Sequence, residues 1–157
     1  MLTYRLIHLI ETHSSTLAQT LLHKIQKSEM TRAYTHVPID ELQHRVSEIY
    51  LHLGEWLTSK SDGDIDKHYN HIGMRRAEQG VPLSQLVWAI VLTKDTLWDF
   101  ILNDAAPDRP VELFGRQELL RLLDHFFDRA IHAAAVGHEW ANEHISKANN
   151  SGPRKVG

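Results

Sequence analysis

The chain contains no cysteine among its 157 residues. This absence excludes disulfides, thiolate nucleophiles, iron–sulfur clusters and cysteine-based zinc sites, and it favours a reducing, cytoplasmic setting. No uncharged apolar run approaches the roughly 20 residues that a membrane-spanning helix needs. Arg5 and His8 interrupt the apolar N-terminus, where a signal peptide would have its core. We therefore expect a soluble cytoplasmic protein with no membrane contact.

The chain also lacks a surplus of positive charge and the common catalytic motifs. Seventeen Lys and Arg stand against twenty Asp and Glu, a formal net charge of −3, so nothing drives binding to a nucleic acid. The eight glycines form neither a G-x-G-x-x-G nor a Walker phosphate loop, and no serine lies in a G-x-S-x-G turn. We expect a protein that is not an enzyme and holds no cofactor.

Apolar residues recur at steps of three and four along most of the chain, which is the spacing of a single helix face. The pattern predicts helices over residues 2–25, 38–56, 65–79, 82–104 and 111–147, with a connector over 29–37 and a turn over 106–110. Strand patterns are essentially absent. The length and the 42% hydrophobic content fit one domain. We therefore expect an all-α bundle of five or six helices over residues 1–148, followed by a disordered polar tail over 149–157.

Local signals refine three helix ends. The Ser14–Thr16 cluster can kink the first helix, because hydroxyl side chains compete for backbone hydrogen bonds. Pro38 opens the second helix, with Asp40 and Glu41 near the positive end of its dipole. Gly80 suits a left-handed C-terminal cap.

The last predicted helix carries apolar residues on two faces. One row holds Leu113, Leu120, Phe127, Ala134 and Ala141, and a neighbouring row holds Leu119, Phe126, Ala133 and Trp140. The chain's own core covers one face, and a second subunit is the economical cover for the other. We therefore expect a homodimer whose interface contains Leu119, Leu120, Phe126, Phe127, Ala133, Ala134 and Trp140.

Twelve histidines raise the question of a metal or haem site. Glu41 and His44 form one Glu-x-x-His motif, but a di-iron bundle needs a second, which is missing. His68 and His71 are three residues apart and lack an evident third ligand. We expect no metal site, and a haem or metal sensor using these histidines is kept as an alternative.

The stretch His138–Asn142 resembles the H-E-x-x-N box of histidine-kinase dimerisation helices, in which the imidazole accepts a phosphoryl group. The proline that follows this box in those kinases is missing here, and the chain has no room for an ATP-binding domain. A histidine phosphotransfer module using His138 is the alternative function that this resemblance implies.

The stretch Ile72–Pro82 is similar to the segment of globin-coupled sensors that holds the haem-ligating histidine. Those sensors place a glycine four residues after the histidine and a proline two residues further on, and here these are Gly80 and Pro82. The ligand position is then occupied by Arg76, which is permanently charged and does not ligate iron. The resemblance implies that haem binding is lost.

Globin-like helices without a haem ligand resemble the RsbRD-type N-terminal sensory domain of stressosome co-antagonist proteins, also found ahead of histidine kinases. The similarity spans about Thr3 to Ala148. The residues that carry it are Tyr69, Gly73, Arg76, Ala77, Gly80, Pro82, Leu83, the run Phe126–Ala130 and Gly137. The resemblance implies a globin-like, dimeric, non-haem signalling module whose last helix leads to an effector, with a kinase or an anti-sigma-factor pathway protein as its downstream partner.

A signal pocket would be expected around Arg76, Trp56 and His71. Arg76 has two possible roles: it pairs with Glu78 or another acid at the surface, or it faces a buried pocket. A buried arginine needs an acidic or carbonyl partner to offset its desolvation. The sequence leaves these two roles open.

Overall fold

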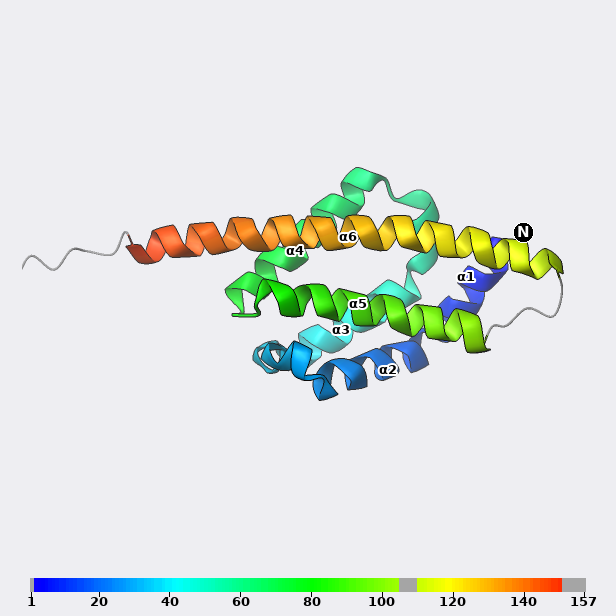
Figure 1. Ribbon diagram of the computed structural model, residues 1–157, viewed down its shortest axis with the longest axis horizontal. Coiled ribbons are helices and arrows are strands. Elements are labelled where there is room, and N and C mark those ends of the chain that lie inside the picture. The colour runs from blue at the N-terminus through cyan, green and yellow to red at the C-terminus, as the bar shows by residue number, and fades with distance from the viewer. Residues whose placement is uncertain (1, 105–109, 151–157) are drawn as a thin grey trace, which may run out of the picture.

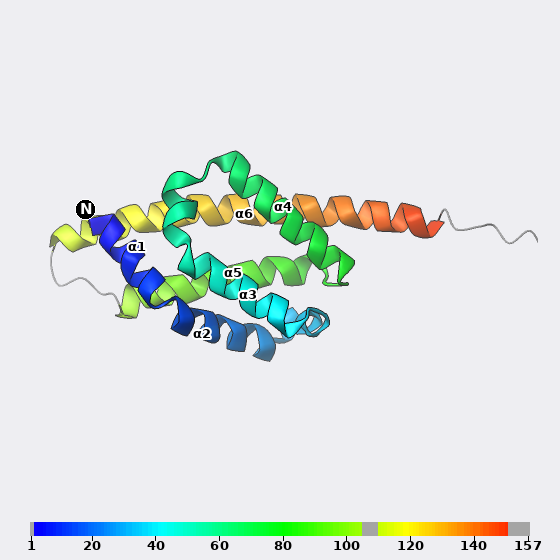
Figure 2. The same cartoon turned by 180° about the vertical axis from the view of Figure 1, so that it is seen from behind.

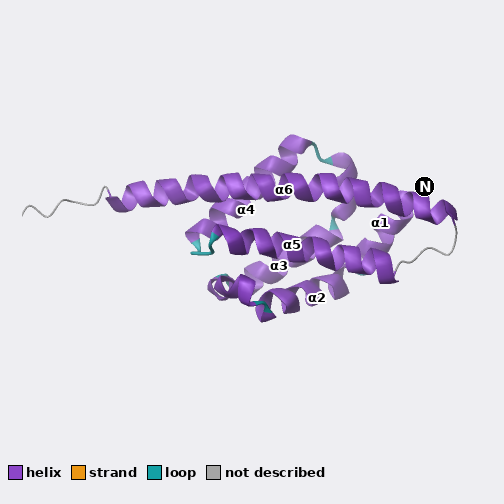
Figure 3. Ribbon diagram, viewed as in Figure 1, coloured by secondary structure: helices purple, strands orange, loops and turns teal. Residues whose placement is uncertain are grey.

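The computed structural model describes residues 2–104 and 110–150, and every regular element among them is a helix (Figures 1 and 3). The predicted all-α class is therefore confirmed. The elements are α1 (Leu2–Thr12), α2 (Ser14–Lys27), η1 (Glu29–His36), α3 (Ile39–Leu51), η2 (Glu55–Ser59), α4 (Asp62–Glu78), α5 (Leu83–Asp99), η3 (Phe100–Asp104) and α6 (Pro110–Asn150). Within the described ranges, no helix combines the length and apolar character that a membrane span requires.

The first predicted helix is broken into α1 and α2 at His13. The hydroxyl of Thr12 donates to the carbonyl of His8 at 2.7 Å, and Nδ1 of His13 contacts the carbonyl of Leu9 at 2.8 Å. These side chains hydrogen-bond to carbonyls that would otherwise accept only from backbone amides of the helix. The break therefore comes just before the Ser14–Thr16 cluster that predicted it.

Several predicted boundaries need correction. The helices predicted over 38–56 and 82–104 end at Leu51 and Asp99, and the π-helices η2 and η3 follow them. The segment predicted as a connector forms the 3-10 helix η1, which the hydroxyl of Ser28 caps by accepting from the amide of Met30. Helix α4 begins three residues earlier than expected, because Ser61 and Asp64 form a capping box in which each side chain accepts from the other's amide. Gly80 has φ 78°, the left-handed conformation predicted for it.

Helix α4 crosses α6 at very short range (Figure 2). Gly73 and Gly137 make this approach possible, because each faces the other helix's backbone. A Cβ at Gly73 would collide with the carbonyl oxygen of Ala134, and a Cβ at Gly137 would collide with that of Asn70. The crossing fixes where α4 lies on α6 and therefore positions the last turns of α4.

The two apolar rows of α6 are absorbed by the core of a single chain. The buried members are Leu119, Phe126, Phe127, Ala133, Ala134 and Ala141. Within the single chain, helices α1, α4 and α5 all pack on α6. Of the other members of the two rows, Leu120 is half-buried, Trp140 is 49% exposed, and the side chain of Leu113 lies outside the described part. The interface predicted from the sequence stays a prediction.

The C-terminal end of α6 projects beyond the other helices (Figure 1). All side chains from Asn142 to Asn150 are exposed. Trp140 stacks on His144 one turn later, with ring centroids 3.7 Å apart. The helix includes the first two residues of the predicted tail, and residues 151–157 lie outside the described part.

Candidate functional site

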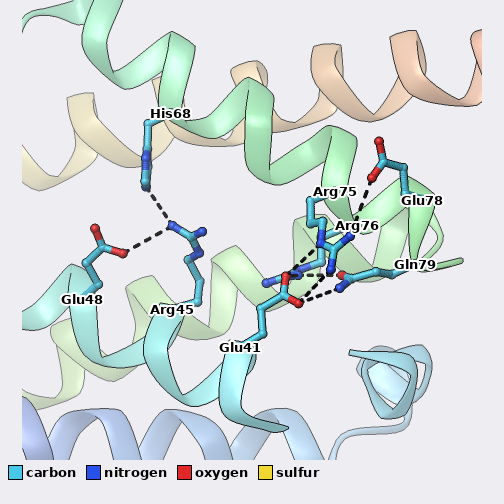
Figure 4. A network of polar contacts seen from close by, with 8 residues as sticks. All are labelled: Glu41, Arg45, Glu48, His68, Arg75, Arg76, Glu78 and Gln79. Carbon is cyan, nitrogen blue, oxygen red and sulfur yellow. Dashed lines mark hydrogen bonds and ion pairs between the residues drawn. The ribbon is translucent and has the colours of Figure 1, made fainter. Parts of the chain in front are cut away.

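A cleft between α3 and α4 is lined mainly by charged and histidine side chains (Figure 4). Its volume is about 280 Å³. The residues that line it are Glu41, Arg45, His68, His71, Ile72, Arg75 and Arg76. The backbones of α3 and α4 are not closely packed here, so side chains bridge the gap between the two helices.

Arg76 has the buried role of the two that the sequence left open. It is 2% exposed. Its Nη1 donates to Oε1 of Glu41 at 3.0 Å and to Oε1 of Gln79 at 2.7 Å, and its guanidinium lies over the ring of Tyr34. Glu78, the surface partner considered for Arg76, instead pairs with Arg75. Glu41 supplies the compensating charge that a buried arginine requires.

Glu41 is the acceptor at the centre of the site. Nε and Nη2 of Arg75 donate to its two carboxylate oxygens at 3.2 and 3.3 Å, and Nε2 of Gln79 donates to Oε2 at 2.9 Å. With the bond from Arg76, each oxygen accepts two hydrogen bonds. The hydrogen bonds from Arg75, followed by those from Arg76, hold the pKa of Glu41 below its ordinary value, and partial burial only partly opposes this.

Glu41→Gln should destabilise the protein at neutral pH by about 2 kcal/mol, because it removes the charge that compensates a buried arginine. The pKa of Glu41 is lowered from 4.5 in the folded protein, so its stabilisation is complete above about pH 4.5 and is lost as the pH falls through the lower folded-state value. The deficit of the variant should therefore shrink on acidification. Urea unfolding of both proteins between about pH 7 and pH 3 measures it, and a pH-independent deficit would contradict the assigned ion pairs.

A second polar group lies at the other end of the cleft. Nη1 of Arg45 donates to Nε2 of His68 at 3.2 Å and to Oε2 of Glu48 at 3.4 Å. Because Nε2 of His68 accepts, the ring is neutral in this arrangement. Burial, and then the neighbouring positive charge of Arg45, lower the pKa of His68 in agreement with this.

The cleft contains two of the three residues predicted for a signal pocket. Arg76 and His71 line it, whereas Trp56 packs behind it, 4.7 Å between ring centroids from His68. Trp56 also contacts Tyr69 and Phe126, so it belongs to an aromatic cluster of the core. Among the described residues, no three His, Asp or Glu side chains are arranged to hold a metal ion.

Sequence reasoning assigned Glu41 to the helix dipole and to a metal motif, and it overlooked Arg45 and Gln79. Gln79 could have been found, because it lies one helical turn after Arg76. Nothing in the sequence indicates that the first turn of α3 faces the last turn of α4. That pairing depends on the crossing of α4 with α6.

A smaller cavity of about 60 Å³ lies in the core beside the cleft. Arg45, Ile72 and Arg76 line both spaces, and the rings of Tyr69 and Phe127 help to close the inner one. This inner space is much smaller than the cleft.

His138 of α6 hydrogen-bonds to Val81, which follows the end of α4. It is buried, its Nε2 donates to the carbonyl of Val81 at 2.6 Å, and its Nδ1 accepts from Asn142 at 3.3 Å. Both ring nitrogens are engaged and solvent does not reach them. A phosphodonor has no access to this imidazole, so the geometry does not support the phosphotransfer alternative.

Comparison with known proteins agrees with the resemblance seen in the sequence. A family model described as the RsbT co-antagonist protein rsbRD N-terminal domain matches residues 15–150. No curated protein and no solved structure matches the chain. The matched range contains the cleft, both glycines of the helix crossing and the whole of α6.

Proposed function

Because the chain belongs to the family of RsbT co-antagonist protein rsbRD N-terminal domains, we propose that it is a non-enzymatic, cytoplasmic regulatory domain that acts as a homodimer and transmits a signal through α6. In this proposal its downstream partners are a kinase or a protein of an anti-sigma-factor pathway. The globin-like ancestry implied by the resemblance belongs to the same proposal.

The observation that supports this proposal is the length of α6 and its projection beyond the body of the domain. This helix has 41 residues, packs on α1, α4 and α5, and then leaves the body of the domain (Figure 1). A rigid helix that contacts most of the core and ends outside it can convert a small change in packing into a movement of its exposed end.

A chain of hydrogen bonds joins the cleft to the point where α6 leaves the body. The amide of Val81 donates to the carbonyl of Arg76 at 2.9 Å, and the carbonyl of Val81 accepts from His138. His138 in turn accepts from Asn142, which begins the exposed part of α6. A rearrangement around Arg76 would therefore act on α6 through few intermediates, provided that the packing has two alternative states.

The homodimer is proposed on a different set of residues from those the sequence suggested. Trp88, Val91, Trp98 and Leu102 follow one another at steps of three, seven and four residues, so they share one face of α5 and η3. Leu102 is 44% exposed, whereas the indole Nε1 of the half-buried Trp98 is itself buried and has no hydrogen-bond partner in the described structure. The apolar surface proposed for the contact combines this face with the half-buried Ile131 and Ala135 of α6. A second copy of the chain would cover it.

Leu102→Glu should weaken this dimer, because it places a charge in an apolar contact. We expect a sedimentation mass of about twice the monomer for the natural chain, and a dissociation constant raised about tenfold or more in the variant. Leu51→Glu is the matched control, since Leu51 is 49% exposed on α3 and lies outside the proposed face. A natural chain that sediments as a monomer, or equal effects of the two variants, would overturn the proposed dimer.

A further inference from the structure

We propose that Arg75, Arg76 and Gln79 form a binding clamp for a small soluble carboxylate, and that Glu41 is an internal carboxylate which this ligand displaces. The inference rests on the proposed function only in treating the ligand as the signal. The binding site itself is argued and tested separately from the dimer.

The geometry of the clamp shows which chemical group it accepts. Three of the four hydrogen bonds to Glu41 come from α4 and the fourth from Gln79, the residue that caps it, whereas α3 contributes only the carboxylate (Figure 4). Arg75 uses two nitrogens, one for each oxygen, which is the forked arrangement by which guanidinium groups recognise carboxylates. The donors therefore already surround a carboxylate in good geometry, and a carboxylate from another molecule fits the same positions.

The burial of Arg76 means that this position must hold an anion. Its side chain is 3% exposed, and an unpaired guanidinium in such a place would be strongly destabilising. Glu41 is less constrained, because its side chain is 27% exposed and stands on the first turn of α3. Glu41 can thus turn towards solvent if another anion takes its place, whereas Arg76 cannot move out.

The cleft provides room for the rest of such a ligand. Its volume of about 280 Å³ corresponds to several water molecules at roughly 30 Å³ each. Arg45, His68 and His71 also line it. The Nε of Arg45 is buried and has no hydrogen-bond partner in the described structure, so it is a donor available for a bound acid.

The charges of the cleft favour exchange of one carboxylate for another. Arg45 and Arg75 keep Glu48 and Glu78 as neighbours at 3.4 and 3.8 Å. When Glu41 turns away, Arg76 is left with one uncompensated positive charge, which a monocarboxylate neutralises. The exchange also breaks the ionic link between α3 and α4, next to the hydrogen-bond chain that leads to α6.

The test uses acetate as the probe and the full chain as the protein. Acetate binding is followed by calorimetric titration and by thermal unfolding, and acetate replaces chloride so that the ionic strength stays constant. We expect weak saturable binding to the natural chain. Arg75→Gln should weaken this binding by about tenfold or more, because it removes the forked pair. Arg5→Gln, at an exposed arginine of α1, should leave it unchanged.

Removal of the internal competitor should have the opposite effect. Glu41→Ala should bind acetate about tenfold more tightly than the natural chain and regain thermal stability as acetate is added. If this variant does not fold, Glu41→Gln serves for the same comparison. Binding to Glu41→Ala without any binding to the natural chain would show that Glu41 is a fixed structural partner, and would overturn the proposal.

Two further outcomes would also overturn the proposed ligand site. One is equal acetate affinity in Arg75→Gln and the natural chain, and the other is tighter binding of inorganic phosphate than of acetate. Failure of the site and failure of the proposed function remain distinguishable. If the chain is monomeric but binds acetate as described, the ligand site is supported and the dimer is not. If the chain is dimeric but binds no carboxylate, the dimer is supported and the ligand site is not.

Discussion

Gly73→Ala should lower the free energy of unfolding by about 3 kcal/mol or more, and Gly137→Ala should do the same, which places both at the upper end of overpacking effects. The added Cβ would overlap the backbone carbonyl of Ala134 in the first case and that of Asn70 in the second. A backbone carbonyl cannot turn aside as a flexible side chain can. The helices would have to separate, and the packing of α4 on α6 would be lost.

Urea unfolding at one fixed protein concentration measures this effect, because the stability of a dimer depends on concentration. Gly63→Ala is the matched control in the first turn of α4. Its Cβ would meet only the Ser61 hydroxyl, at 3.7 Å, so stability should change by less than about 0.5 kcal/mol. Equal stability of Gly73→Ala and Gly63→Ala would show that the close crossing is absent.

His138→Leu should cost about 2 to 3 kcal/mol, since it leaves the carbonyl of Val81 buried without a donor. His138→Gln keeps a donor at this position and should therefore lose less stability than His138→Leu. His132→Leu, at an exposed position of the same helix, should change stability by less than about 0.5 kcal/mol. Urea unfolding of the three variants compares them, and a tolerated His138→Leu would show that the histidine is not the link between Val81 and α6.

The order of the α-helices could be predicted from the sequence because each follows from local rules, whereas the 3-10 helix η1 and the π-helices η2 and η3 were not predicted. Apolar spacing gave the helices, the Ser14–Thr16 cluster indicated the break before α2, and Gly80 marked the end of α4. The start of α4 was missed only because the capping box of Ser61 and Asp64 was not recognised.

Contacts between distant segments were harder to predict. The sequence shows two apolar rows on α6, but it does not show that three other helices pack on them, so Phe126 and Ala134 were assigned to a second subunit. The contacts of the candidate site were also hard to predict from the sequence. Arg76 could be singled out by its position in a motif, whereas its partner Glu41 is 35 residues away and meets it only because α4 crosses α6 at Gly73.

The most direct test of the central claim uses a single spin label on the projecting end of α6. Ser146 is exposed there, and the absence of native cysteine makes Ser146→Cys a unique labelling site. The distance between the labels of two subunits is measured by pulsed electron paramagnetic resonance, with and without saturating acetate. A dimer that transmits a signal through paired long helices predicts dipolar coupling between the labels and a distance that shifts on acetate binding, but not in Arg75→Gln. Labels that show no coupling at any protein concentration would contradict this account.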